Sequence, residues 1–287
     1  MIAELVAPLI KEMDAADYFA DFGATSQSML KDFGDRRRLF HAYYVARDVE
    51  RPQPKEDGKL RIDKGTATHT ALLEPDRFDS LVVGWPPGYL SDDGGIRSKA
   101  AKDYRDEQRA AGRIILKDAQ REVVRAMSES VRRVCGEWMA LPCRKEQAVY
   151  WTNELTGLPM KMRLDWLLIG QQPIIFDFKT TGDASPRMFR KRVEENGYAI
   201  QHAQYVEGVE AVTGVTPLFY FVAVEDSYPF ACSIHELDDN AASDARSYRN
   251  GLLTDLKACF ESGDWSEVWE HKINKLSLRS FCFEGNQ

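Results

Sequence analysis

Apolar and polar positions recur with two different periods along the chain, and the change of period separates predicted helices from predicted strands. Between residues 98 and 140, apolar side chains recur three and four positions apart, which predicts helices interrupted near Gly112. Residues 147–152, 159–169 and 173–180 are rich in apolar residues and are separated by turn-forming residues. We expect these three segments to form a meander on which the preceding helix packs.

The pattern continues with further helices and strands toward the C-terminus. Residues 185–186 are Ser-Pro, a pair typical of a helix start, and residues 198–212 predict another helix. Residues 217–225 and 229–237 predict two more strands, before a closing helix over residues 238–262. The order of helix, three strands, helix, two strands and helix predicts an α/β fold in which helices flank a mixed central sheet.

The first part of the chain predicts shorter helices. Ser26 or Ser28 is a candidate N-cap for one of them. Residues 51–59, RPQPKEDGK, predict a polar connection, and residues 65–78, GTATHTALLEPDRF, predict a short helix that Pro75 ends or closely follows. We therefore expect a mainly helical N-terminal part.

Length and composition favour one domain. A chain of 287 residues that is 44% hydrophobic can bury a full core. We expect a single domain over residues 1–287, in which residues 1–115 form a mainly helical N-terminal elaboration on a core of residues 116–287.

Several classes of protein and site are disfavoured by the same sequence. The apolar stretches are far shorter than the roughly 20 residues of a membrane span, and the N-terminus lacks the basic and apolar regions of a signal peptide. We therefore expect a cytoplasmic protein without a membrane partner. The cysteines form no CxxC pair, so we expect free thiols rather than a zinc or iron–sulfur site. These cysteines are Cys135, Cys143, Cys232, Cys259 and Cys282.

Two charged side chains lie inside the otherwise apolar segment 174–181, IIFDFKTT. Because successive side chains of a strand point to opposite faces, Asp177 and Lys179 share one face and Phe176 and Phe178 share the other. We expect one face of this strand to pack in the core and the other to carry charge.

The preceding predicted strand carries a charged face of the same kind, made of Lys161, Arg163 and Asp165. If the connecting turn centres on Gln171, Asp165 lies directly opposite Asp177, with Cβ atoms about 4.5–5.5 Å apart.

Two facing carboxylates repel each other unless a cation or a shared proton relieves them. A divalent metal is one such cation, because Mg²⁺ takes one or two aspartate oxygens together with water and phosphate oxygens. Lys179 would then lie on the same face, placed to orient or deprotonate a water molecule. The alternative is a surface hairpin whose aspartate and lysine side chains face solvent.

Residues 163–165, Arg-Leu-Asp, followed after a turn by IIFDFKTT, resemble the core of the PD-(D/E)xK nucleases. In this resemblance Asp165 is the first acid and residues 177–179 are the (D/E)xK motif, while Arg-Leu-Asp replaces a literal Pro-Asp pair. The segment GTATHTALLEPDRF, which contains His69, resembles the histidine segment of the RecE-like (exonuclease VIII type) phage exonucleases. KEQAVYWTNELTG resembles their acidic strand and contains Glu146.

The segment QHAQY extends the resemblance to the broader RecB-like nuclease group, in which a glutamine and a tyrosine four positions apart follow the motif on a helix. Gln201 and Tyr205 occupy these positions. The likeness covers residues 65–205 and is weaker toward the N-terminus.

The resemblance implies an Mg²⁺-dependent exodeoxyribonuclease, with Mn²⁺ as a possible substitute, that digests duplex ends 5′ to 3′ and leaves 3′ single strands for phage-type recombination. It also implies a homo-oligomeric ring and a single-strand annealing protein as partner. Alternatives are an endonuclease of the same superfamily and a non-catalytic DNA-binding module on this fold. The predicted catalytic residues are Lys179, Asp177, Asp165 and Glu146, and the predicted metal ligands are His69, Asp165, Asp177 and the Phe178 carbonyl. The predicted DNA-binding residues are Gln201, Tyr205, Arg187, Arg190 and Arg192.

Each of these residues has a purely structural alternative. His69 could bond within the core, and the role of Glu146 is open between support of the metal site and a strand-edge ion pair. Gln201 and Tyr205 share a helix face, because residues four apart do, and that face could be internal. The net charge of −7 requires a confined basic surface for any contact with DNA. The arginines between residues 187 and 192 are one candidate for it, although a solvated helix face is the default interpretation.

Overall fold

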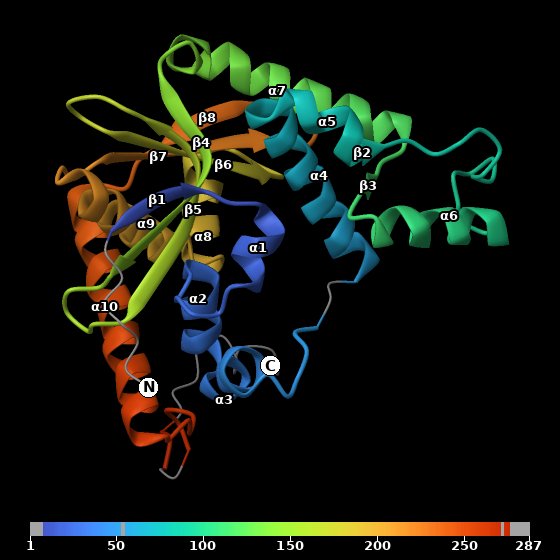
Figure 1. Cartoon of the computed structure of the whole chain (residues 1–287). Helices are drawn as coiled ribbons and strands as arrows, with labels where there is room; N and C mark the ends of the chain where they lie inside the picture. The colour runs from blue at the N-terminus through green and yellow to red at the C-terminus, as the bar shows by residue number, and fades with distance from the viewer. Residues whose placement is uncertain (1–7, 53–54, 271–272, 276–287) are drawn as a thin grey trace, which may run out of the picture.

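A mixed sheet with helices on both faces forms the centre of the protein (Figure 1). The computed structural model describes residues 8–52, 55–270 and 273–275. The strands of the main sheet are β1 (Leu9–Glu12), β4 (Cys143–Thr152), β5 (Pro159–Leu168), β6 (Ile174–Thr181), β7 (Leu218–Glu225) and β8 (Cys232–His235). They lie in the order β1-β4-β5-β6-β7-β8, in which β6 and β7 are parallel and the other neighbours are antiparallel.

A smaller parallel pair and a series of helices complete the fold. The pair consists of β2 (Val82–Val83) and β3 (Ile114–Ile115). The helices are α1 (Ala15–Ala20), α2 (Gln27–Asp35), α3 (Arg37–Phe40), the π-helix η1 (His41–Ala46), α4 (Glu56–Leu73), α5 (Pro75–Leu81), α6 (Lys99–Ala110), α7 (Asp118–Met139), α8 (Pro186–Glu195), α9 (Tyr198–Thr213) and α10 (Asp239–Ser262).

The two faces of the sheet bury separate hydrophobic clusters. In Figure 1, α7 lies on one side of the sheet, whereas α9 and α10 lie on the other. The cluster under α9 and α10 includes Leu164 and Ile175, and the cluster under α4 and α7 includes Trp166 and Phe176. A third cluster around Tyr18 packs α1 against β4 on the α4 side of the sheet, away from α9. The sheet is therefore covered on both faces.

The predicted α/β fold with a mixed, helix-flanked central sheet is confirmed. The meander β4-β5-β6 forms as expected, and the pairing of Trp166 with Phe176 centres its second turn on Gln171. The ladder between β5 and β6 ends at this pair, one position before Asp165 and Asp177. The predicted register is therefore correct, but the two aspartates lie where the strands begin to separate.

The regular alternation predicted for the second strand is wrong. Leu164 and Leu167 face the same core although they are three positions apart, and Trp166 faces the opposite one. On the neighbouring strand, Glu146 has a positive φ of 52° and interrupts the pairing at the level of Asp165. Strands β4 and β5 thus share a local irregularity at these two acids.

The predicted common charged face of the meander is also wrong, because Lys161 on β5 and the Asp177–Lys179 pair on β6 lie on opposite faces of the sheet, and helices cover both. Lys161 is only 2% exposed, and its ammonium group donates a hydrogen bond of 2.5 Å to the Tyr18 carbonyl. Ile175, on the same face of β6 as Asp177 and Lys179, is completely buried in the cluster under α9. The charged side chains of Lys161 and Asp177 are therefore buried rather than exposed to solvent.

The N-terminal part differs in two respects from the prediction. Residues 9–12 form a strand at the edge of the main sheet, and α4 begins at Glu56, inside the predicted connection 51–59. Ser26 caps α2 as expected, since its hydroxyl accepts a hydrogen bond from the Met29 amide at 3.3 Å.

The remaining expectations concern membrane helices and thiols. Within the described parts of the chain, no helix combines the length and the apolar character that crossing a membrane requires. Cys135, Cys143, Cys232 and Cys259 are free thiols, and Cys282 lies outside the described residues.

Candidate metal centre

The irregularity in β4 and β5 brings acidic side chains together beside α4. Ligand atoms of His69, Glu146 and Asp165 all lie within 4.8 Å of one another. The carboxylates come from the two strands at the point where their pairing is interrupted, and the imidazole comes from α4. Three separate elements therefore supply one compact group, which we call the His69–Glu146–Asp165 group.

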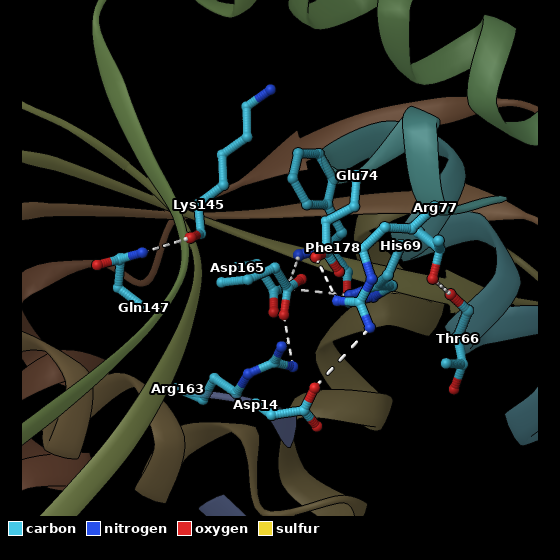
Figure 2. A network of polar contacts seen from close by, with 12 residues as sticks. Asp14, Thr66, His69, Glu74, Arg77, Lys145, Gln147, Arg163, Asp165 and Phe178 are labelled. Atoms are coloured by element: carbon cyan, nitrogen blue, oxygen red, sulfur yellow. Dashed lines mark hydrogen bonds and ion pairs between the residues drawn. The ribbon is translucent and has the colours of Figure 1, made fainter. Parts of the chain in front are cut away.

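The helix α4 holds His69 over the end of the β5–β6 ladder. Nε2 of His69 lies 2.9 Å from the carbonyl oxygen of Phe178, and Nδ1 lies 3.6 Å from Asp165 Oδ2. The same Asp165 oxygen accepts a hydrogen bond of 2.8 Å from the Phe178 amide. Figure 2 shows the side chains of His69 and Asp165 directed toward the backbone of Phe178, whose ring points away. The side chain of Asp165 thus takes a position where β5 no longer pairs with β6.

Glu146 is held by an arginine from the neighbouring strand. Arg163 Nη1 lies 2.5 Å from Glu146 Oε2, and the Arg163 carbonyl accepts a hydrogen bond of 3.0 Å from the Tyr205 hydroxyl. Burial and the negative charge of Asp165 raise the pKa of Glu146 to about 7, against the opposing charge of Arg163. Negative charge is therefore crowded at this point, and a cation there would be favourable.

Asp177 lies next to this group but is paired with other residues. It is 1% exposed, its Oδ1 accepts a hydrogen bond of 2.5 Å from Gln201 Nε2, and its Oδ2 forms an ion pair with Lys179 Nζ. Burial raises the pKa of Asp177 to about 6, although the charge of Lys179 opposes this shift. The negative charge of Asp165 also contributes to this upward shift of the pKa.

Lys179 remains positively charged despite its buried position. Burial lowers its pKa, but the carboxylates of Asp177 and Asp165 outweigh that effect and raise the pKa above its usual value. The ammonium also lies 4.9 Å from the ring centroid of Tyr198. At neutral pH this side chain is a hydrogen-bond donor rather than a base.

The His69–Glu146–Asp165 group opens into a cleft of about 670 Å³. Its walls come from α1, α4, α5, β4 and β5, and Tyr205 also borders it. At the rim, Arg77 lies 2.5 Å from Glu74 Oε1 and 4.0 Å from Asp14 Oδ2, as Figure 2 shows. We call this space the acidic cleft.

Lys179 opens into a different cavity, of about 310 Å³. Arg61 from α4 and Arg192 from α8 line it, together with Asn196 and Tyr198. We call it the basic cavity. The nearly inaccessible Asp177 therefore contacts the ammonium group at the basic cavity while its charge interacts with that of Asp165 at the acidic cleft.

The structure divides the predicted DNA-binding residues into two sets. Gln201 and Tyr205 are buried, at 6% and 9% exposure, and bond to Asp177 and to the Arg163 backbone. The arginines are more accessible: Arg187 and Arg190 are exposed, and Arg192 borders the basic cavity. Direct contact of Gln201 or Tyr205 with DNA stays a prediction. In the structure, Gln201 orients the Asp177 carboxylate and Tyr205 holds the backbone of Arg163.

Sequence reasoning missed the rim and the arginine partner of Glu146. The spacing of Glu74 and Arg77 is visible in the sequence, but a pair three apart occurs on most helix surfaces. Arg163 was predicted only to lie on the same face as Asp165. Its contact with Glu146 depends on the distorted backbone at Glu146, which no residue pattern indicates.

The donor set fits a hard divalent cation. The two carboxylates supply the oxygen ligands that hard ions such as Mg²⁺ and Mn²⁺ prefer, whereas the imidazole nitrogen of His69 is a ligand more typical of transition metals. Among the described residues, the group contains no cysteine. The Phe178 carbonyl is also adjacent, since it lies 2.9 Å from His69 Nε2. A cation here would relieve the repulsion between Glu146 and Asp165.

Comparison with known proteins identifies the family of the chain. A family model described as "PDDEXK-like domain of unknown function (DUF3799)" matches residues 26–272. The chain belongs to this PDDEXK-like family. No curated protein matches the chain.

Among solved structures, one described as "Putative exonuclease" from Eubacterium rectale is similar to this PDDEXK-like protein, with a TM-score of 0.59. The likeness covers 96% of this chain and 100% of the other, at 15% sequence identity, and therefore concerns the fold. SSO0001 (TM-score 0.30, 12% identity, 73% and 89% coverage) and VC1899 from Vibrio cholerae (TM-score 0.24, 11% identity, 91% and 60% coverage) are more distant. The family assignment confirms the PD-(D/E)xK superfamily, whereas a RecE-like identity stays a prediction.

Proposed function

We propose that this PDDEXK-like protein is a divalent-metal-dependent deoxyribonuclease that hydrolyses DNA phosphodiesters. The observation that carries the proposal is the convergence of His69, Glu146 and Asp165 within 4.8 Å, next to the Asp177–Lys179 pair. Within a PDDEXK-like family, buried acids beside a buried lysine in this order along the chain support hydrolytic chemistry.

In this proposal His69, Glu146 and Asp165 would hold Mg²⁺, with Mn²⁺ as a substitute, and the Phe178 carbonyl lies beside them. Asp177 would join this set only by giving up a contact with Gln201 or Lys179. When bound, the ion supplies Lewis-acid charge at the phosphoryl group. Arg163 fixes the Glu146 carboxylate, and Gln201 fixes that of Asp177. These contacts hold the ligands in place before the substrate binds.

Lys179 acts on the water and on the phosphate. Lys179 lines the basic cavity and not the acidic cleft, so this role requires that the scissile phosphate spans the two spaces beside Asp177. The raised pKa of Lys179 keeps the ammonium protonated, so that Nζ would there orient the attacking water and offset charge on the phosphoryl oxygens. The water oxygen forms a bond to phosphorus as its proton passes to solvent water, the bond between phosphorus and the leaving oxygen breaks, and the leaving oxygen takes a proton from solvent. The basic cavity beside Lys179, with Arg61 and Arg192, is suited to phosphate groups of the same strand.

We further propose that the enzyme is a 5′ to 3′ exonuclease on duplex ends. This finer assignment is supported by the resemblance to RecE-like exonucleases and by the description of the Eubacterium rectale structure as an exonuclease. The same resemblance supports a homo-oligomeric ring and a single-strand annealing partner. Size-exclusion chromatography with light scattering would test the ring, and co-purification with the annealing protein would test the partner.

The experiment that tests the function uses wild-type protein with Mg²⁺ on linear duplex DNA, in which one strand is labelled at its 5′ end. The expected products are labelled mononucleotides or short fragments from the first turnovers, while a covalently closed circle remains intact. Cleavage of the circle would favour an endonuclease instead. Absence of cleavage with either Mg²⁺ or Mn²⁺ would refute the nuclease.

A further inference from the structure

A second cavity, of about 560 Å³, adjoins the acidic cleft. The two spaces share the side chains of Tyr18, Phe19, Ser26 and Ser28 as walls, so that they meet at α1 and at the start of α2. Away from the cleft, the second cavity continues along η1 and the segment that follows it. We call this second cavity the aromatic groove.

Aromatic rings make up a large part of the groove wall. These rings belong to Tyr18, Phe19, Phe22, Tyr43 and Tyr44. The ring of Tyr44 is fixed by a hydrogen bond of 2.6 Å from its hydroxyl to Asp32 and by contact with Phe22, with 5.8 Å between the ring centroids. Phe19 differs, because 65% of its surface is exposed although it lies at the junction of the two cavities.

The groove is basic in a protein that is acidic as a whole. Arg47, Arg51 and Lys161 line it, against one lining acid, Glu50, whereas the net charge of the chain is −7. Arg51 is also paired with Asp32 at 3.0 Å, so that Arg47 and Lys161 supply the positive charge that this pair does not offset. Lys161 forms part of the wall with almost no solvent exposure, and its Nζ lies 4.3 Å from the ring centroid of Tyr18. Arg47 lies over Phe22, with 5.0 Å between its Cζ atom and the ring centroid. Positive charge and aromatic rings therefore lie side by side along this wall.

Neighbouring cations and exposed rings are the features by which proteins bind single-stranded nucleic acid, since bases stack on rings while phosphates pair with cations. We propose that the aromatic groove binds a single-stranded DNA segment adjacent to the scissile phosphate. Bases stack on Phe19 and Tyr43, and the phosphates face Arg47 and Arg51. The inference rests on the proposed nuclease function, and it specifies that the end of the duplex is separated before cleavage.

Binding of a single strand is measured in chelator, so that the strand is not cut. The probe is a short oligodeoxythymidylate that carries one 2-aminopurine, whose fluorescence changes when it stacks. Phe19→Ala and Tyr43→Ala are each expected to weaken binding by about 5- to 150-fold, the effect of removing one base–aromatic stack. Phe19→Tyr retains a ring and is expected to bind as the wild type does.

The matched control is Tyr248→Ala on α10, because Tyr248 is 57% exposed and lines neither cavity. This variant is expected to bind with wild-type affinity. Arg47→Gln combined with Arg51→Gln is expected to flatten the slope of log K against log salt by about 0.7 for each phosphate that these arginines no longer neutralise.

Unchanged affinity in both ring variants would overturn the proposal. Phe19 is exposed, so a second copy of the chain could cover it instead. In that case Phe19→Ala would change the oligomeric state without changing oligonucleotide affinity, which also overturns the proposal. Failure of the nuclease assignment gives a different result. If the ring variants lose binding but the wild type cuts no DNA with Mg²⁺ or Mn²⁺, the groove binds single-stranded DNA and the proposed nuclease activity is refuted.

Discussion

Asp177 and Lys179 form a buried ion pair, and this determines how substitutions at either residue affect stability. Asp177 Oδ2 contacts Lys179 Nζ, and neither side chain is more than 15% exposed. Removal of one partner leaves the other charge buried without compensation, which is costlier than removal of both. The site is therefore expected to contribute to stability and to catalysis through the same contact.

We expect Asp177→Asn and Lys179→Met each to lower the free energy of unfolding by about 3–5 kcal/mol, and the double variant by less than the sum of the two. Urea unfolding of the four proteins in chelator measures this coupling. All three variants are expected to lose more than about 100-fold in cleavage rate. Strictly additive stability effects would contradict a direct pairing of the two side chains.

His202 gives a pH dependence of stability. Burial lowers the pKa of His202 to about 4, and the positive charge of Arg246 on α10 adds to the shift. Nδ1 of His202 has no hydrogen-bond partner among the described residues, and 4.9 Å separates the ring centroids of His202 and Phe219. The unfolded chain binds a proton at this residue near pH 6.5, whereas the folded chain does so only near pH 4. The neutral, buried His202 therefore makes its full contribution to the free energy of unfolding above pH 6.5, and this contribution is lost as the pH falls toward 4.

The corresponding loss between pH 6.5 and pH 4 is about 3 kcal/mol at most. The difference between wild type and His202→Leu isolates it from the carboxylates that titrate in the same range. Wild type is expected to lose stability more steeply than His202→Leu on acidification. Parallel curves for the two proteins would show that His202 is accessible to protons in the folded state.

Strand geometry alone made the positions of some site residues predictable. Asp165 and Asp177 follow from the turn centre at Gln171, which the pairing confirms. Arg163 and Gln201 were assigned no contact with the acids, since these contacts depend on a distorted backbone and on how α9 approaches the sheet. Contacts that depend on tertiary packing produce no recognisable pattern in the local sequence.

At the scale of elements, Gly208 sets the distance between α9 and the sheet. A Cβ atom added there would lie 2.7 Å from Met162 Cε and 2.8 Å from a ring carbon of Trp151. Both side chains are fully buried, so the neighbours have little room to move. Close packing at this point brings Gln201 and Tyr205, on the same helix, to the site.

We expect Gly208→Ala to destabilise the protein by about 1–3 kcal/mol through overpacking, although alanine is the better helix former. Gly251 in α10 is the matched control, because an added Cβ there meets no atom within 4 Å. Gly251→Ala is expected to stabilise the protein by up to about 1 kcal/mol. Thermal unfolding compares the two, and stabilisation by both substitutions would refute the close approach of α9.

The helix α8 offers a second test at this scale, because its arginines differ in location. Arg192 borders the basic cavity, whereas Arg187 and Arg190 lie on the exposed face of the helix. We expect the triple alanine variant to weaken duplex binding equally for all sequences and to flatten the salt slope by about 0.9 for each phosphate that the helix no longer neutralises. Arg192→Ala alone is expected to flatten the salt slope by about 0.9, the effect of one phosphate contact. An unaltered slope in the triple variant would mean that the arginines of α8 face solvent and do not contact DNA.

Most elements were predictable either because apolar residues recur at helical spacing, as in α7, or because turn residues mark their boundaries, as for β5 and α9. Strand β1 was not, since residues 9–12 are mostly exposed and pair only with the distant strand β4. The change of face in β5 at Asp165 was also unpredictable. It arises where β4 is distorted at Glu146, and side-chain pattern does not encode that φ angle.

At the scale of the whole molecule, the protein combines a net charge of −7 with cavities of opposite character close to the site. The acidic cleft gathers carboxylates, while the basic cavity and the aromatic groove present arginine and lysine side chains. Because a net negative charge repels DNA in general, we expect the proposed DNA binding to be restricted to these cavities. This distribution favours action at a confined position on DNA over coating of a duplex.

The central claim is that the His69–Glu146–Asp165 group holds the divalent ion on which DNA hydrolysis depends. The most direct test is the initial rate of nucleotide release from linear duplex as a function of Mg²⁺ concentration, for wild type, Glu146→Gln and the exposed control Glu154→Gln. We expect Mg²⁺-dependent hydrolysis by wild type and by Glu154→Gln, and a rate at least about 100-fold lower for Glu146→Gln at saturating Mg²⁺, with all three proteins equally folded by circular dichroism. Wild-type rate and Mg²⁺ dependence in Glu146→Gln, or hydrolysis by wild type in chelator, would contradict the account.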